Sequence, residues 1–205
     1  MFLVEESAPA VEALPIAGLR DHLRIGSGFA LADDPAEDAA LAGFLRAAIA
    51  TIEARTGKVL LTRRFTLRLD DWRDAQSQPL PLAPVLSVDG VRIDDGRGNV
   101  AEVDPAGYRL VPDGQRPRLE AAGTFLPAIP RRGFVVVTFT AGFGADWAGV
   151  PPDLAQAVML LAARYHEDRS FEGTTSAMPQ GVAALIERWR AVRVLGGRGA
   201  SGARR

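Results

Sequence analysis

The stretch VPPDLAQAVMLLAARYHEDR, residues 150–169, decides how the rest of the chain is arranged. It opens on Pro151 and Pro152, and proline suits a first helical turn because its missing N–H has no partner there. The side chains that follow are apolar nearly all round as far as Arg164, and such a helix is buried on more than one side. We therefore predict a central helix around which the other elements pack. Its surface has two interpretations: the core of one domain, or a face that partly meets another subunit through Leu154, Val158, Leu161 and Tyr165.

A second helix is marked at both of its ends. Asp34 suits the N-cap position, Pro35 suits the first helical position, and Glu37 completes a capping box. Gly57 stands just past the last turn, where a left-handed residue is wanted. Apolar residues recur between these ends at the spacing of one helical face, so we predict an amphipathic helix over 34–56. Before it we predict a short helix over 16–25 and a flexible segment over 1–13.

The hydrophobic period changes from that of a helix to that of a strand after Val59. Phe65, Leu67 and Leu69 alternate with polar residues, which is typical of a half-buried strand. The run FVVVTFT over 134–140 is apolar on both faces, so we expect it to be central in its sheet. Residues 76–84 read as a loop. Further strands are predicted over 85–93, with a turn near Asp89 and Gly90, over 100–103, around Tyr108 and Leu110, and around Arg118–Glu120.

The fold class predicted from these elements is α+β, with a helical core and an inserted small antiparallel β module. One domain spans 1–205, with the helical framework over 16–57 and 150–195 and the β insert over 59–144. The last helix of the framework is expected to run from Pro179 to about Val194. A basic, glycine-rich tail over 196–205 is expected to be flexible.

Composition limits the classes of function. The chain has 205 residues, 47% of them hydrophobic, with a net charge of −1 and no cysteine. Bulk charge therefore predicts no nucleic-acid or membrane partner, and thiolate chemistry is excluded. The N-terminus lacks a basic segment followed by a long apolar run, so we predict no signal peptide.

Three groups of residues are candidates for a catalytic or ligand-binding site. His166, Glu167 and Asp168 lie together but not on one helical face, and no metal-binding spacing surrounds them, so we favour an exposed helix end over a hydrolase site. Gly142-Phe143-Gly144 lacks the rest of a phosphate-binding pattern and is interpreted as a turn from strand to helix. The acidic pairs Asp70-Asp71 and Asp94-Asp95 are interpreted as turn residues. We therefore predict no catalytic residue, no metal and no cofactor.

Arginines gather at the C-terminal end and have two interpretations. They are a solvated helix face with a loose end, or a segment that becomes ordered on a partner through contacts with carboxylates or phosphates. Direct DNA binding is an alternative function, although no aromatic residue interleaves the tail to stack on bases. The residues concerned are Arg188, Arg190, Arg193, Arg198, Arg204 and Arg205.

Taken in order, several segments resemble the head–tail connector (adaptor, or head-completion) proteins of long-tailed bacteriophages and gene transfer agents. They are LRDHLRI at 19–25, IEARTGKVLLTRRFTLRLDDW at 52–72, PLPLAPVLSVDGV at 79–91, the strand around Tyr108, VVVTFTAGFG at 135–144, and the stretch at 150–169. These motifs are structural rather than catalytic, and their order and spacing carry the resemblance.

The resemblance implies a structural role rather than an enzyme. It implies a ring, usually of twelve subunits, that binds beneath the portal protein and contacts the next neck or tail-completion protein. DNA would pass through the ring's channel without sequence-specific binding, and there would be no membrane partner. It also implies that the C-terminal segment reaches toward the portal, and it places the protein in the neck of a virion or virion-like particle after assembly in the bacterial cytoplasm.

Overall fold

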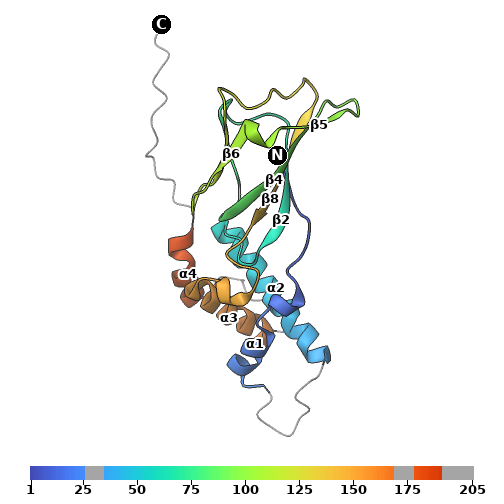
Figure 1. Ribbon diagram of the computed structural model, residues 1–205. Coiled ribbons are helices and arrows are strands. Elements are labelled where there is room, and N and C mark those ends of the chain that lie inside the picture. Colours follow the sequence, from blue (N-terminus) through green and yellow to red (C-terminus); the bar gives the residue numbers. More distant parts are fainter. Residues whose placement is uncertain (26–34, 169–177, 191–205) are drawn as a thin grey trace.

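The computed structural model describes residues 1–25, 35–168 and 178–190. Helices gather at one end of an elongated molecule and strands at the other, as Figure 1 shows. The predicted α+β class is therefore confirmed. None of the helices in the described part of the chain is long and apolar enough to cross a membrane.

Four α-helices make up the helical end within the described residues. The long helix α2 (Pro35–Thr56) packs against α3 (Pro152–Glu167), which also contacts α1 (Ile16–Leu23) and α4 (Gln180–Ile186). Gly57 follows α2 with a φ of 68°, so the left-handed residue predicted after this helix is confirmed. The predicted N-cap, Asp34, lies outside the described residues.

The last helix is shorter than its apolar pattern predicts. After α4 the chain forms one 3₁₀ turn, η4 (Glu187–Trp189), and Arg190 already has the extended backbone angles φ −65° and ψ 139°. The prediction of a helix to about Val194 is therefore wrong at Arg190, and the residues beyond it lie outside the described part. Two further 3₁₀ turns, η1 (Val11–Ala13) and η3 (Trp147–Gly149), precede α1 and α3.

A five-stranded antiparallel sheet forms one layer of the β end. Its strands lie in the order β1 (Phe2–Glu5), β2 (Arg63–Leu69), β8 (Phe134–Ala141), β4 (Val85–Asp94) and β5 (Val100–Glu102). The central place predicted for the strand over 134–140 is confirmed, because β8 lies between β2 and β4. The prediction that residues 1–13 are flexible is wrong, because residues 2–5 pair with β2 along their whole length.

A smaller antiparallel sheet packs on one face of the first. It has the order β3 (Ser77–Pro79), β7 (Arg118–Ala121) and β6 (Tyr108–Val111), with the 3₁₀ turn η2 (Pro105–Gly107) before β6. Residues 76–84, predicted as a loop, thus contribute a strand. The turn predicted near Asp89 and Gly90 is also wrong: β4 continues through them, and register shifts against β8 absorb the irregularity.

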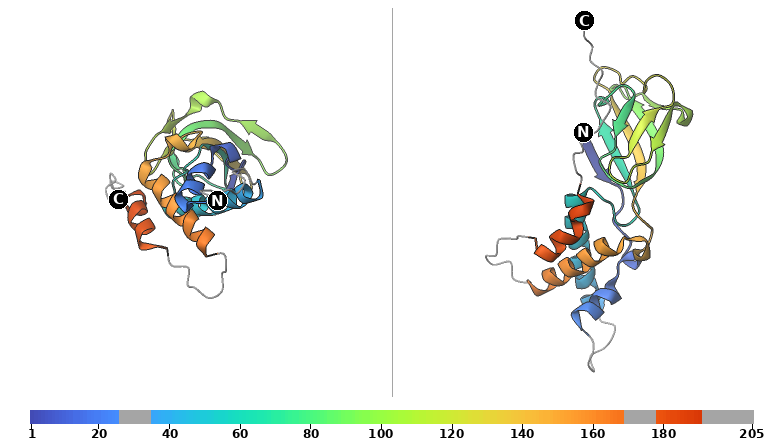
Figure 2. Two further views of the ribbon diagram at one scale, coloured as in Figure 1. Left: turned by 90° about the horizontal axis from the view of Figure 1, so that it is seen from below. Right: turned by 90° about the vertical axis from the view of Figure 1, so that its left-hand side faces the viewer.

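Among the residues that the structure describes, each end of the molecule has one apolar cluster. Leu119 of the small sheet is buried together with Val137 and Phe139 of β8, so the β end is closed between two layers. Figure 2 shows these layers from the side. The helical cluster has α3 at its centre, with Leu154, Val158 and Leu161 buried against α2 and α4.

Turn chemistry explains most of the acidic and glycine motifs. Asp94 and Asp95 accept backbone N–H groups two residues further on, from Gly96 and Arg97, as turn residues do. Gly142 has a φ of 143°, and a side chain there would collide with the backbone of Thr62. The interpretation of Gly142-Phe143-Gly144 as a structural turn is therefore confirmed.

Candidate functional site

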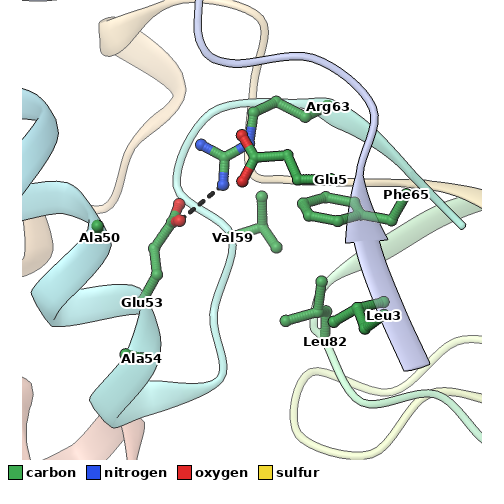
Figure 3. A pocket seen from close by; sticks show the side chains of 9 residues that line it. All are labelled: Leu3, Glu5, Ala50, Glu53, Ala54, Val59, Arg63, Phe65 and Leu82. Atoms are coloured by element: carbon green, nitrogen blue, oxygen red, sulfur yellow. Dashed lines mark hydrogen bonds and ion pairs between the residues drawn. The ribbon is translucent and has the colours of Figure 1, made fainter. Parts of the chain in front are cut away.

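An open groove lies where the helical end meets the β end (Figure 3). It has a volume of about 320 Å³, and most of its lining is apolar. One wall is the strand β1 and the other is the last two turns of α2. The lining residues are Leu3, Glu5, Ala50, Glu53, Ala54, Val59, Arg63, Phe65 and Leu82.

A buried arginine ties three elements together at one end of this groove. The Arg63 side chain, at the start of β2, is only 4% exposed, and its Nη2 lies 2.6 Å from Oε2 of Glu53 on α2. Its Nε lies 3.2 Å from Oε1 of Glu5 on β1. The other carboxylate oxygen of Glu53 accepts the backbone N–H of Leu60 at 2.7 Å. One cation on β2 thus lies between the two walls of the groove and contacts an acidic side chain of each, Glu5 on β1 and Glu53 on α2.

Burial sets the protonation behaviour of Glu53. Loss of water raises the pKa of this carboxyl above its ordinary value of 4.5, and the Arg63 charge and the Leu60 N–H oppose that rise without cancelling it. The charged form is therefore stabilised by Arg63 and by the Leu60 N–H. This dependence makes the pair a joint between α2 and β2 whose strength changes with pH.

The strand β1 leaves one backbone edge free beside the groove. The Glu6 N–H donates to the Arg64 carbonyl at 3.0 Å, so in this antiparallel ladder the backbone groups of Phe2 and Val4 point toward β2. Those of Leu3 and Glu5 consequently point away, and they have no partner among the described residues. The side chains of Phe2 and Val4, on the uncovered face, are 65% and 40% exposed.

A second joint is made by Lys58, the only lysine of the chain. It is 1% exposed, and its Nζ donates to the carbonyl of Gly114 and, at 2.8 Å, to Oε1 of Gln115. Burial lowers the pKa of Lys58, and the Asp113 charge opposes this. The side chain therefore holds the turn between β6 and β7 against the end of α2.

The residues predicted for subunit packing lie mostly inside the chain. Leu154, Val158 and Leu161 are at most 3% exposed, and they pack in the helical cluster. Tyr165 is half-buried, and its hydroxyl lies 3.1 Å from that of Thr51 on α2. The chain's own core accounts for their burial without a second subunit.

The two C-terminal arginines in the described part both have acidic partners. The Arg188 Nε lies 2.7 Å from Oδ2 of Asp153, which also accepts the indole N–H of Trp189 at 2.7 Å. Arg190 pairs with Glu187 at 3.2 Å. The contacts with Asp153 hold η4 on the start of α3. The other four candidates, Arg193, Arg198, Arg204 and Arg205, lie outside the described residues.

The side chains at the acidic helix end around His166 contact other side chains of the same chain. His166 packs edge-on against the Phe44 ring, and Arg164 pairs with Asp168 at 2.6 Å. Within residues 1–25, 35–168 and 178–190, no group of three or more histidine or acidic side chains is placed to hold a metal ion.

Neither a scan against family models nor a search of curated proteins gives a match. Solved structures do match, over nearly the whole chain. A chain in a structure described as the neck of an empty GTA (gene transfer agent) particle computed with C6 symmetry is 57% identical, with a TM-score of 0.86. A chain in the virion of a native gene transfer agent particle is 57% identical, with a TM-score of 0.84. A chain in the neck of a native GTA particle computed with C12 symmetry is 52% identical, with a TM-score of 0.81. Each match covers 97% of this chain and 100% of the other.

The fold and these matches define the class: a two-ended α+β protein of the kind found in virion necks. The chain belongs to the head–tail connector, or adaptor, family of gene transfer agents, and the sequence resemblance is confirmed.

Proposed function

We propose that this chain is a structural adaptor of the neck of a gene transfer agent or related particle. It forms a ring of copies beneath the portal, joins head to tail and continues the DNA channel. The observation that carries this proposal is full-length similarity to chains in GTA necks, at up to 57% identity. Because one of those necks was computed with C12 symmetry, a ring of twelve is the arrangement we propose here.

The portal is the partner proposed for the C-terminal end of the chain. Arg188 and Arg190 pair with acidic side chains of the same chain. We therefore assign the contact with the portal to the arginines that follow them in the sequence. The next neck or tail-completion protein would bind the opposite side of the ring. A role of this kind needs assembly surfaces rather than a reaction centre. The contacts of Arg63 and Lys58 hold the helical end and the β end in a fixed orientation to each other.

The test is to mix the full chain with its cognate portal, measure the mass of the particle formed, and image it by electron microscopy. We expect a portal-sized ring that gains a second stacked ring. Portal and chain that stay apart over a range of salt and protein concentrations would overturn the adaptor proposal.

Deletion of residues 196–205 tests the part given to the tail. We expect an unchanged melting temperature and weaker portal docking, because the apolar clusters of the described residues are built from side chains up to Trp189. Unchanged docking would remove the tail from the mechanism. Duplex DNA is the control ligand in the same assay, since binding through arginines to phosphates would fall steeply as salt is raised.

A further inference from the structure

A small cavity between the end of α2 and α4 has two arginines in its lining. Its volume is about 210 Å³, and the residues that line it are Arg55, Met178, Ala183, Ile186, Glu187 and Arg190. Arg55 has no ion-pair partner among the described residues. Arg190 pairs with Glu187 at 3.2 Å, and both of these side chains are more than half exposed. The cavity thus holds two guanidinium groups and one carboxylate, which leaves one positive charge without a counterion.

We propose that this cavity binds an acidic side chain of a partner protein, with Arg55 and Arg190 as its cations. The inference rests on the proposed function, in which the partner is the portal, and it adds a contact to that of the arginines after Arg190. A guanidinium group donates two parallel hydrogen bonds to a carboxylate, and such charged hydrogen bonds are stronger than neutral ones. Arg190 is free to take part, because an exposed ion pair such as Arg190–Glu187 contributes little and is readily exchanged.

The size and lining of the cavity favour a single acidic side chain over nucleic acid. Its volume lies below the roughly 300–1,000 Å³ of pockets for small-molecule ligands, so one side chain fills it. Met178 and Ile186 offer apolar surface to the methylene groups that carry a carboxylate. Duplex DNA, by contrast, is held by several cations along a surface, and the neighbouring Arg188 is already paired with Asp153.

The position of the cavity joins it to the surface proposed for portal docking. Arg190 is the last described residue before the C-terminal segment, so a partner side chain in the cavity lies where the arginine-rich end of the chain begins. Arg55 belongs to the last turn of α2, where the helix dipole favours a cation whether or not a partner is bound. The cation is therefore in place before docking.

Titration of the full chain against its cognate portal, with the mass of the particle as readout, tests the site. Arg55→Gln should weaken docking by about tenfold, because hydrogen bonds to a charged group are lost. Its melting temperature should not change, since the side chain is exposed. Arg46→Gln is the matched control: it removes the same charge from α2, but it lies nine residues earlier, about 14 Å away and on the opposite side of the helix.

Glu187→Gln gives a result of opposite sign. It removes the carboxylate that competes for Arg190 and repels an incoming one, so docking should strengthen by roughly threefold. A residue that only supports the fold gives no such gain when it is substituted.

Docking that is unchanged in Arg55→Gln, or weakened equally in Arg55→Gln and Arg46→Gln, would overturn the inference and leave the adaptor function standing. Weaker docking of Glu187→Gln would also contradict it. Duplex DNA is titrated in parallel: DNA binding that is lost in Arg55→Gln while portal docking persists would show that the cavity takes a phosphate, and the inference would be wrong. If the unsubstituted chain does not dock at all, the proposed function fails, and this inference fails with it.

Discussion

The helix α3 and the strand β1 differ in how their apolar side chains are used. In α3, Leu154 and Val158 are fully buried by α1, α2 and α4, although the helix is apolar enough to suggest a subunit interface. In β1, Phe2 is 65% exposed, and the outward backbone groups of Leu3 and Glu5 are unpaired among the described residues. The apolar side chains of α3 are thus buried within the chain itself. Those on the outer face of β1 stay exposed.

This difference separates stability from assembly. The apolar content of an element indicates how much surface it can bury. Whether that surface is buried within the chain or by another subunit depends on the elements packed around it. A free strand edge with exposed apolar side chains is, by contrast, a ready template for another chain. Substitutions in α3 should therefore act on folding, and substitutions in β1 should act on the ring.

The largest effect on stability is expected from Leu154→Ala. Its side chain is 0% exposed in the centre of the helical cluster, and a buried leucine truncated to alanine costs about 2–5 kcal/mol. We expect a loss of about 4 kcal/mol in the free energy of unfolding, measured by urea denaturation of the isolated chain. Gln156→Ala on the exposed side of α3 is the control, with an expected change under about 0.5 kcal/mol. A small loss for Leu154→Ala would mean that α3 depends on a neighbouring subunit after all.

Arg63→Met should have the next largest effect. It leaves the Glu53 carboxylate buried without its cation, and breaking such a pair from one side costs about 3 kcal/mol. The matched control is Arg64→Met, because that side chain is 57% exposed and its pair with Asp89 contributes less than about 1 kcal/mol. A double variant that adds Glu53→Gln should recover much of the loss, and failure to recover it would show that Arg63 acts through packing alone.

The same pair predicts a pH dependence. Because the pKa of Glu53 is raised on folding above 4.5, the native chain keeps this proton to higher pH than the unfolded chain does. This group's contribution to stability therefore falls as pH rises from about 4.5 through the raised pKa, and is flat above it. Arg63→Met removes the opposing charge, so the fall should extend to higher pH, and Glu53→Gln should abolish it. Urea denaturation at a series of pH values measures both; identical profiles for wild type and Arg63→Met would contradict the assignment.

Lys58→Met should cost less, about 1 kcal/mol, because the lost hydrogen bonds are partly offset by removal of a buried charge. The effect should be local. Amide hydrogen exchange is expected to speed up over residues 113–116, which Lys58 holds, and to stay unchanged in the turn at 95–99, which closes on its own Asp95 contacts. An equal rise in amide exchange rate in both turns would contradict a local role of Lys58 in holding residues 113–116.

The sequence was sufficient for elements whose signals are local. The C-terminal glycine and the periodicity of α2, the central place of β8 and the turns at Asp94-Asp95 each follow from neighbouring residues. What it missed depends on contacts between distant segments: β1 is a strand only because β2 offers it an edge, and the helix expected to continue to Val194 already ends in η4. The Glu5–Arg63–Glu53 joint left one signal, since Arg63 has the same strand parity as the buried Phe65 and Leu67. A charged side chain that faces inward requires a buried partner of opposite charge. The sequence does not show that this partner is Glu53 of α2, because the two residues are brought together only by the fold.

The smallest effect on stability, and the one that sharpens the comparison most, is expected from Phe2→Ser. The side chain is 65% exposed, so the free energy of unfolding of the isolated chain should change by less than about 0.5 kcal/mol. Ring formation with the portal should nevertheless weaken by roughly tenfold per contact, because burying a phenylalanine contributes about 1.5 kcal/mol or more. Phe125→Ser is the matched control: that side chain is 63% exposed but lies between β7 and β8. Titration of each variant against portal, followed by mass measurement, separates the two outcomes. Equal weakening by both variants would mean that exposed apolar area in general, rather than the edge of β1, holds neighbouring copies together.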